Sequence, residues 1–172
     1  MSIFDVNVSS NFPSKLHSIV FGMGCFWGAE KKFWQLNGLY TTVVGYAGGV
    51  DETPSYEKVC TGTTGHAEVV KIVYDQKKLA LNKLLKVFWE SHDPTQINRQ
   101  GNDIGTQYRS VIYVNNKTEL NFCIDSRNVF QEALDNKRMG IIQTEIKIHD
   151  LFFNAEEYHQ KYFFKNPNGY CG

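Results

Sequence analysis

The sequence predicts an α+β fold: a two-layer sandwich in which helices cover one face of a sheet that contains antiparallel strands. Short apolar runs rich in β-branched residues alternate with segments whose apolar residues recur at helical spacing, in the order strand, helix, strand, strand, helix, strand. In addition, 42% of the 172 residues are hydrophobic, which is enough for a proper core. We therefore expect residues 1–172 to form a single domain.

The predicted elements follow one another without a linker, an internal repeat or a low-complexity segment. Residues 1–17 are polar and weakly patterned, so we expect an N-terminal arm. The predicted strands are 18–23, 41–46, 67–74, 108–114 and 145–149, and the predicted helices are 25–36, 79–92 and 118–136. Asn154 and Glu157 resemble a capping box and predict a last short helix. This order is the ferredoxin-like split βαβ arrangement, with an added C-terminal helix and a flexible tail at 165–172.

The second predicted helix has the clearest pattern. Its apolar residues follow the i, i+3, i+4, i+7, i+8 spacing of an amphipathic helix: Leu81, Leu84, Leu85, Phe88 and Trp89. The polar stretch 93–107 after it contains two glycines and is expected to be a loop. Loops of this length are uncommon unless they have a function, so this loop is a candidate part of a site.

Charge and cysteine content exclude several classes of protein. Eighteen basic residues balance eighteen acidic ones and form no stripe, so we expect no nucleic-acid partner. No signal peptide and no apolar run of about 20 residues is present, so we expect a cytoplasmic protein without membrane association. The four cysteines are far apart, which argues against a structural zinc site, a thioredoxin-type motif and static disulfides. We expect no metal and no cofactor.

A cysteine stands between two glycines in the segment Gly-Cys-Phe-Trp-Gly at residues 24–28, where a strand is predicted to turn into a helix. Unpaired N–H groups and the helix dipole favour an anion there, and a thiolate is an anion. We therefore expect a lowered pKa and a nucleophilic thiol at Cys25, beside an apolar wall of Phe26 and Trp27. Most free cysteines are instead buried structural thiols, an interpretation that suits Cys123 far better.

An acidic residue interrupts the third predicted strand. Glu68 shares one face of that strand with Val70, Ile72 and Tyr74. If this face lies in the core, loss of water raises the pKa of the carboxyl group, and a protonated glutamate at neutral pH is a general acid. Glu68 could also lie at the strand end and point into solvent. The pattern alone does not decide between these two interpretations.

Several other polar residues are candidates for a site. Tyr56 and Tyr108 lie in or beside glycine-rich loops and could donate hydrogen bonds, although a lone tyrosine is more often a core-edge residue. Asp103 could orient such groups or be solvated. His66 and His92 could act as a base for a reactive thiol. His92 continues an apolar helix stripe and His66 follows a glycine turn, so structural roles are favoured for both.

The last cysteine, Cys171, lies one residue before the end of the sequence in a turn-rich tail. A terminal cysteine is often incidental. It also has what a resolving thiol needs, because a mobile tail can reach an oxidised Cys25. Cys60 lies between turn residues and could be structural or reactive.

Seven segments together resemble the A-type peptide methionine sulfoxide reductases, over residues 18–172. The segments are Gly24-Cys25-Phe26-Trp27-Gly28, Gly45-Tyr46-Ala47-Gly48-Gly49, Tyr56 before Val59-Cys60, Gly65-His66-Ala67-Glu68-Val69-Val70, His92-Asp93-Pro94-Thr95-Gln96, Asp103-Ile104-Gly105-Thr106-Gln107-Tyr108-Arg109-Ser110 and Gly169-Tyr170-Cys171-Gly172. Each segment alone is suggestive, and all of them in this order are very specific.

The resemblance implies reduction of methionine S-sulfoxide, free or in proteins, by a single catalytic domain. It implies that Cys25 attacks the sulfoxide sulfur and becomes a sulfenic acid, while Glu68 protonates the sulfoxide oxygen. The remaining roles are hydrogen bonds to that oxygen from Tyr56 and Tyr108, a seat for the methyl group at Phe26 and Trp27, and a substrate backbone contact at Asp103.

The resemblance also implies how the enzyme is recycled. Cys171 condenses with the oxidised Cys25 to a disulfide, which thioredoxin reduces. Some family members carry a glycine-rich tail with a further recycling cysteine, and this sequence stops at Gly172 without one. We therefore expect a two-cysteine cycle in which Cys60 and Cys123 take no part. The expected partners of this monomer are thioredoxin and oxidised proteins or peptides.

Two other functions are compatible with a reactive thiol in an aromatic setting. A cysteine hydrolase or acyltransferase would need a histidine within hydrogen-bond reach of the Cys25 sulfur. A non-catalytic module would use the aromatic residues as a peptide-binding groove, and its function would survive loss of the thiol.

Overall fold

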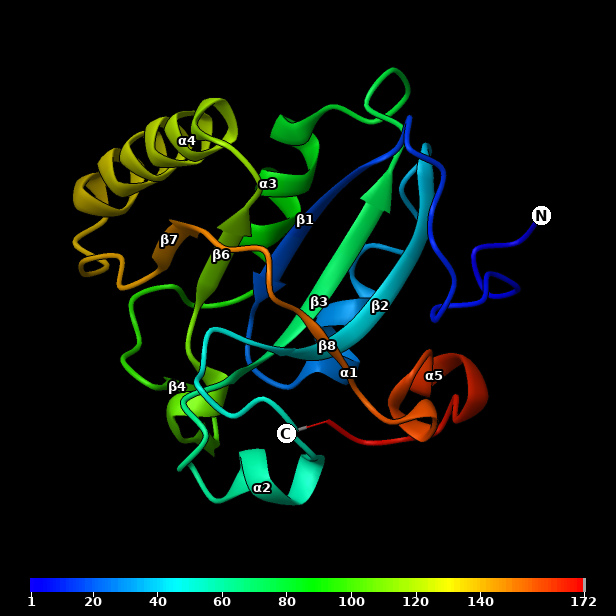
Figure 1. Cartoon of the computed structure of the whole chain (residues 1–172). Helices are drawn as coiled ribbons and strands as arrows, with labels where there is room; N and C mark the ends of the chain where they lie inside the picture. The colour runs from blue at the N-terminus through cyan, green and yellow to red at the C-terminus, as the bar shows by residue number, and fades with distance from the viewer. Residues whose placement is uncertain (172) are drawn as a thin grey trace.

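The computed structural model describes residues 1–171 (Figure 1). Gly172, the last residue of the predicted tail, lies outside the described residues. The strands are β1 (His17–Gly22), β2 (Leu39–Ala47), β3 (Ala67–Tyr74), β4 (Arg99–Gln100), β5 (Asp103–Ile104), β6 (Val111–Val114), β7 (Glu145–Ile148) and β8 (Phe153–Asn154). The helices are α1 (Phe26–Lys31), α2 (Tyr56–Cys60), α3 (Leu81–Glu90), α4 (Lys117–Asn136) and α5 (Tyr162–Lys165), and Thr106–Tyr108 and Glu157–His159 form 3₁₀ turns.

A mixed six-stranded sheet in the order β7-β6-β1-β3-β2-β8 forms the centre of the fold. The four strands β6-β1-β3-β2 are antiparallel to one another in sequence across the sheet, and β7 pairs with β6 in parallel. The predicted α+β class is thus confirmed. Because β3 lies between β1 and β2, the connection through α1 joins two strands that are not neighbours, as a split βαβ unit requires.

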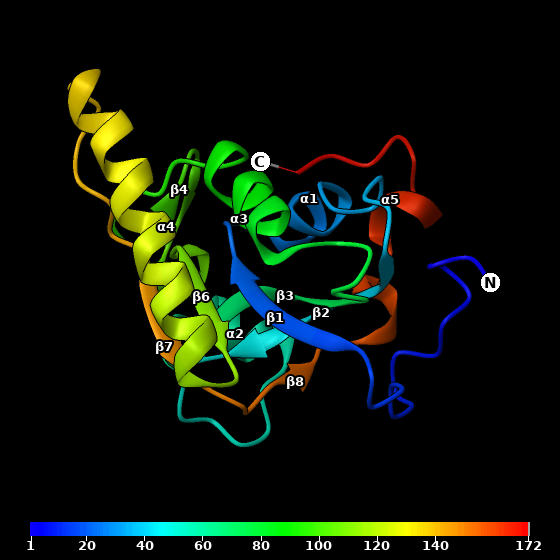
Figure 2. The same cartoon turned by 90° about the horizontal axis from the view of Figure 1, so that it is seen from above.

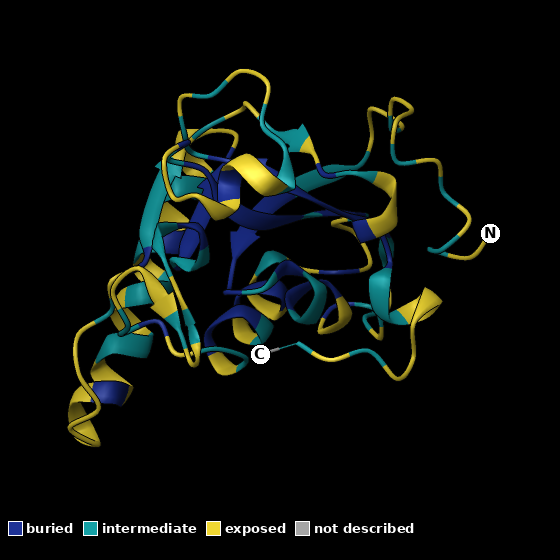
Figure 3. Ribbon diagram, turned by 90° about the horizontal axis from the view of Figure 1, so that it is seen from below, coloured by how far each residue is buried: buried dark blue, intermediate teal, exposed yellow. Residues whose placement is uncertain are grey.

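Helices α1, α3 and α4 lie on one face of the sheet (Figure 2). The larger core cluster fills the space between them and the sheet, with Phe21, Phe33 and Phe88 fully buried. A smaller cluster on the opposite face includes Val69 and Tyr113, and Phe152 from the chain leading into β8 packs against it. The sheet is deeply buried, whereas the N-terminal arm is largely exposed (Figure 3).

The predicted apolar stripe on α3 faces the core: Leu84, Leu85, Phe88 and Trp89 are all buried. The helix is shorter than predicted and ends at Glu90. The first helix also ends early, at Lys31 rather than at residue 36, and turns follow it. Among the described residues, no helix combines the length and apolar character needed to cross a lipid bilayer.

Two segments predicted as loops contain short elements. Helix α2 begins after Ser55, whose side chain accepts a hydrogen bond from the N–H of Lys58, the usual way to cap a helix start. The 93–107 stretch contains the β4–β5 hairpin, which turns at Gly101 with φ of +59°. Tyr108 belongs to a 3₁₀ turn, so the strand predicted at 108–114 starts at Val111.

The capping box predicted at Asn154 and Glu157 is wrong. Asn154 pairs with Gly45 as part of β8, and its side-chain amide donates to the carbonyl of Val8 in the arm. Backbone pairing with the sheet edge therefore prevails over the local cap signal. Glu157 opens only a 3₁₀ turn, and α5 begins later, at Tyr162.

Substitution Phe88→Ala should lower the free energy of unfolding by about 3–5 kcal/mol, because it leaves a cavity in the main core. Phe88 is 0% exposed and stacks on Phe21 with ring centroids 4.8 Å apart. Urea denaturation measures the change. The matched helix control, Val129→Ala, removes a side chain that is 70% exposed and should stay within about 0.5 kcal/mol. Similar losses in both variants would contradict this placement of the core.

Candidate active site

Cys25 lies between the end of β1 and the start of α1, as predicted. It is the N-cap residue of α1, with extended backbone angles of φ −51° and ψ 121°. The preceding Gly24 has φ of +84°, which favours glycine, and a Cβ there would lie 2.8 Å from the side chain of Gln100. This glycine thus allows the sharp turn that brings the cysteine to the helix start.

Glu68 faces the core, so the buried interpretation of its position is confirmed. The residue is 2% exposed, and Val70 and Ile72 on the same strand face belong to the main core. Its carboxyl oxygen Oε1 accepts a hydrogen bond of 3.1 Å from the N–H of Phe26. Burial raises the pKa of Glu68 to about 8; the Phe26 N–H opposes the shift, and the negative charge of Asp103 adds to it. The carboxyl group is therefore mostly protonated at neutral pH.

The two candidate tyrosines lie within electrostatic reach of this carboxyl group. Tyr56 begins α2 and Tyr108 ends a 3₁₀ turn, so the fold brings them together from separate loops. Burial is the largest cause that raises the pKa of both phenols; the next is the hydrogen bond with Cys60 for Tyr56 and the negative charge of Glu68 for Tyr108. Both hydroxyl groups consequently keep their protons and can donate hydrogen bonds. Asp103, on β5, is half-buried and lines the same cleft as Cys25.

The two aromatic residues after Cys25 have different surroundings. Phe26 is buried in the core, whereas Trp27 is half-buried. The indole N–H of Trp27 donates to Nδ1 of His159 at 2.9 Å, and Tyr162 stacks on the indole with ring centroids 3.7 Å apart and 6° between the planes. The sequence analysis missed His159 and Tyr162. No periodicity marks them, and only the long-range contact with Trp27 makes them part of the site.

Cys25 and Cys171 line one cleft of about 330 Å³, together with Gln100 and Asp103. Both are free thiols. Cys171 lies against α1, where a Cβ added to Gly28 would be 3.3 Å from the Cys171 sulfur. The structure thus brings the predicted resolving cysteine to the predicted nucleophile.

The pKa of Cys25 in this arrangement is raised, so the expectation of a lowered value is wrong here. Its hydrogen bond with Cys171, burial and the nearby Glu68 all raise the pKa, and the N–H of Trp27 at the helix start only partly opposes them. The same hydrogen bond lowers the pKa of Cys171. The N–H of Trp27 at the start of the short helix α1 lowers the pKa of Cys25 by less than the contact with the Cys171 thiol raises it.

The other two cysteines lie apart from this pair. Cys123 is fully buried in the main core, as its helical position predicted. Cys60 ends α2 on the exposed side, and burial of its sulfur raises the pKa of the thiol.

Neither candidate histidine is free to act as a base for Cys25. In His66, Nδ1 accepts from the N–H of Gly49 and Nε2 lies 2.7 Å from the carbonyl oxygen of Asp51. In His92, the two nitrogens lie 2.7 Å from the Phe88 carbonyl oxygen and from the Ser110 hydroxyl oxygen. Burial also lowers the pKa of His92 to about 4. Within residues 1–171, no three metal-binding side chains come together.

Comparison with known proteins identifies the chemistry of this site. The family model "Peptide methionine sulfoxide reductase" matches residues 17–172. The peptide methionine sulfoxide reductase MsrA of Brucella anthropi is 56% identical over 161 residues, which cover 94% of this chain and 74% of that relative.

Solved structures agree with this assignment. Methionine sulfoxide reductase A of Corynebacterium diphtheriae superposes with a TM-score of 0.91 at 38% identity, over 99% of this chain and 84% of that one. Mxr1 from Saccharomyces cerevisiae in complex with Trx2 gives a TM-score of 0.63 at 25% identity, over 90% of each chain. This chain belongs to the peptide methionine sulfoxide reductase family and is a peptide-methionine (S)-S-oxide reductase.

Proposed function

We propose that Cys25 and Glu68 perform the reductive step together. The Cys25 sulfur attacks the sulfoxide sulfur and gives up its thiol proton, while Glu68 transfers its own proton to the sulfoxide oxygen and takes up the proton from the thiol. The hydroxyl group then moves from the substrate sulfur to the Cys25 sulfur, as the bond between the two sulfur atoms and the original S–O bond break. The oxygen passes to Cys25 as a sulfenic acid, so the thiol is oxidised while methionine leaves reduced. The observation that carries this proposal is the buried carboxyl group of Glu68, which accepts a hydrogen bond from the N–H of the residue after Cys25 and whose pKa is raised to about 8 by burial.

The other site residues have the chemistry to bind the oxygen and the methyl group of the sulfoxide. Tyr56 and Tyr108 remain protonated and supply hydrogen bonds to the oxygen. Phe26 and Trp27 provide an apolar seat for the methyl group, and Asp103 in the cleft contacts the substrate backbone. A few polar groups in an otherwise apolar site are what a small polar S=O group beside a methyl requires.

Recycling begins when the Cys171 thiol attacks the Cys25 sulfenic acid, which forms a disulfide and releases water. The proximity of the two sulfur atoms supports this pairing. Thioredoxin then reduces the disulfide, as the complex of the yeast relative with Trx2 suggests. The physiological substrates are oxidised proteins and peptides, and residues 1–172 act as one catalytic domain.

The tail is required to move during this cycle. With Cys171 hydrogen-bonded to it, the Cys25 thiol has a raised pKa and keeps its proton. Withdrawal of the tail at 165–172 removes this bond and makes room for the substrate. The flexible tail predicted from the sequence is therefore part of the proposed mechanism.

Replacement of Glu68 tests the acid. Glu68→Gln keeps a hydrogen-bond donor but has no acidic proton, so some activity should remain, whereas Glu68→Ala should lose more. General acids contribute about 10²–10⁴-fold to rate, and we expect the alanine variant to approach the full loss. Single-turnover rates on a methionine sulfoxide peptide provide the measurement. Equal rates for the two variants would argue against proton donation by Glu68.

Replacement of Cys171 tests the recycling thiol. Cys171→Ser should form about one methionine per enzyme and then stall with thioredoxin as reductant, because the sulfenic acid has no internal partner. Product per enzyme over time measures this. The control Cys60→Ser, which alters an exposed thiol outside the cleft of Cys25 and Cys171, should continue for many turnovers. Normal cycling of Cys171→Ser would assign the resolving role elsewhere.

A further inference from the structure

Residues 159–162 hold the ring of Trp27. His159 accepts from the indole N–H, and Tyr162 stacks on the indole face. Glu30 lies three residues after Trp27 on α1, so the two side chains project from the same side of the helix. Glu30 contacts Lys161, which lies between the two residues that hold Trp27.

Glu30 fixes Lys161 through both its backbone and its side chain. Glu30 is 0% exposed. Its Oε2 accepts a 3.0 Å hydrogen bond from the backbone N–H of Lys161, and its Oε1 lies 3.3 Å from Lys161 Nζ. Oε1 also accepts from the hydroxyl of Thr42 on β2 at 2.7 Å. The carboxylate therefore links α1 to the central sheet and to residues 159–162, which contact Trp27.

The backbone of Lys161 needs such support. Its φ is +53°, in the left-handed region that is unfavourable for residues other than glycine. A non-glycine residue keeps this conformation only where its surroundings impose it. The main-chain bond to Glu30 holds this conformation at the backbone, and the side chain of Lys161 is also bonded to the carbonyl of Thr42.

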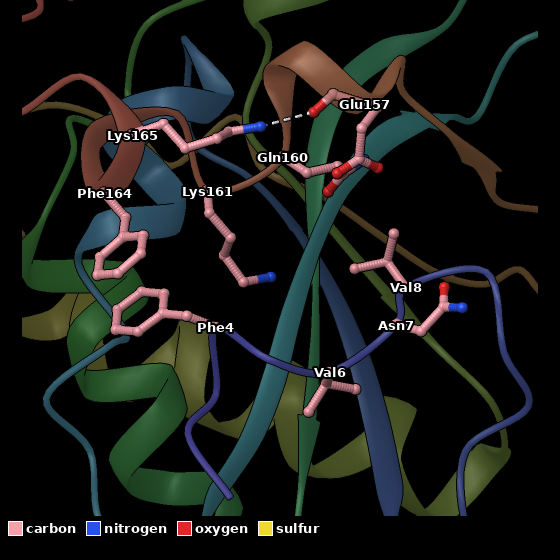
Figure 4. A pocket seen from close by; sticks show the side chains of 9 residues that line it. All are labelled: Phe4, Val6, Asn7, Val8, Glu157, Gln160, Lys161, Phe164 and Lys165. Atoms are coloured by element: carbon pink, nitrogen blue, oxygen red, sulfur yellow. Dashed lines mark hydrogen bonds between the residues drawn. The ribbon is translucent and has the colours of Figure 1, made fainter.

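Lys161 borders a hollow of about 340 Å³, which Val6 of the N-terminal arm lines from the other side (Figure 4). Next to this hollow, the arm contacts α5, because Phe4 and Phe164 stack with ring centroids 4.0 Å apart. Gln160 is held separately, by hydrogen bonds to Val44 and Ala155. Without the bond to Glu30, we therefore expect the backbone of Lys161 and the ring of Tyr162 next to it to shift away from Trp27.

We propose that Glu30 is a positioning residue that acts through Lys161 to hold Trp27, and so sets the size of the seat for the substrate methyl group. This inference rests on the proposed role of Trp27. It predicts that loss of the Glu30 carboxylate weakens discrimination between substrates that differ in the alkyl group on sulfur, with the change in KM rather than in kcat.

The experiment compares free methionine sulfoxide with ethionine sulfoxide, which carries one more methylene on sulfur. One methylene in a shaped apolar pocket is worth about 10-fold or more in kcat/KM. In Glu30→Leu, which removes the acceptor of the Lys161 N–H, we expect this ratio to fall by about threefold or more. The exposed control Glu132→Leu should keep the wild-type ratio. An unchanged ratio in folded Glu30→Leu would overturn the inference.

A paired variant avoids the instability of an unpaired buried charge. Glu30→Leu combined with Lys161→Met removes both charges, a change that buried ion pairs often tolerate. It should fold, as shown by circular dichroism, and should lose discrimination as Glu30→Leu does. Wild-type discrimination in this folded variant would also overturn the inference.

The variant Trp27→Phe distinguishes a failure of the role proposed for Trp27 from a failure of the role proposed for Glu30. It should weaken discrimination, and addition of Glu30→Leu should cause little further loss, because both act on one seat. Strictly additive losses would contradict the inference. If Trp27→Phe left discrimination unchanged, the proposed role of Trp27 would fail first. If only Glu30→Leu left it unchanged, the positioning role alone would fail.

Discussion

The site depends on one contact, the 3.1 Å hydrogen bond from the N–H of Phe26 to the buried carboxyl of Glu68. A carboxyl group that is removed from water resists ionisation, and this burial raises the pKa of Glu68 to about 8. The N–H bond moderates the shift and also fixes the acid next to Cys25. The carboxyl group of Glu68 and the thiol of Cys25 are therefore neighbours, and their surroundings favour the protonated form of both.

The sheet register explains why these two groups meet. Strand β1 runs antiparallel to β3, and Phe21 pairs with Val70, so the end of β1 lies beside the start of β3. Cys25 follows β1 after the turn at Gly24, and Glu68 is the second residue of β3, so the register places them close together. Pairing of β8 with β2 then directs the chain toward α1, where His159 and Tyr162 reach Trp27.

Sequence patterns predicted those parts of the fold and the site that depend on local periodicity. The glycines on either side of Cys25 indicated its place at a helix start, and the apolar stripe on α3 marked the buried side of that helix. The alternation in β3 put Glu68 on one face with Val70, Ile72 and Tyr74, and the structure was needed to show that this face is buried. Features that depend on distant partners were missed. These are the Trp27 contact of His159, the pairing of Asn154 in β8 and the raised pKa of Cys25 next to Cys171.

The protonation state of Glu68 is the central claim, and infrared spectroscopy measures it directly. The difference spectrum between the wild-type protein and Glu68→Gln isolates the carbonyl stretch of this one protonated carboxyl group. We predict that the band is present at pH 7 and disappears as pH rises, with a midpoint of about 8, because the raised pKa keeps the proton bound below that value. A carboxylate band for Glu68 at pH 7, with no protonated form until pH falls below 5, would contradict the account.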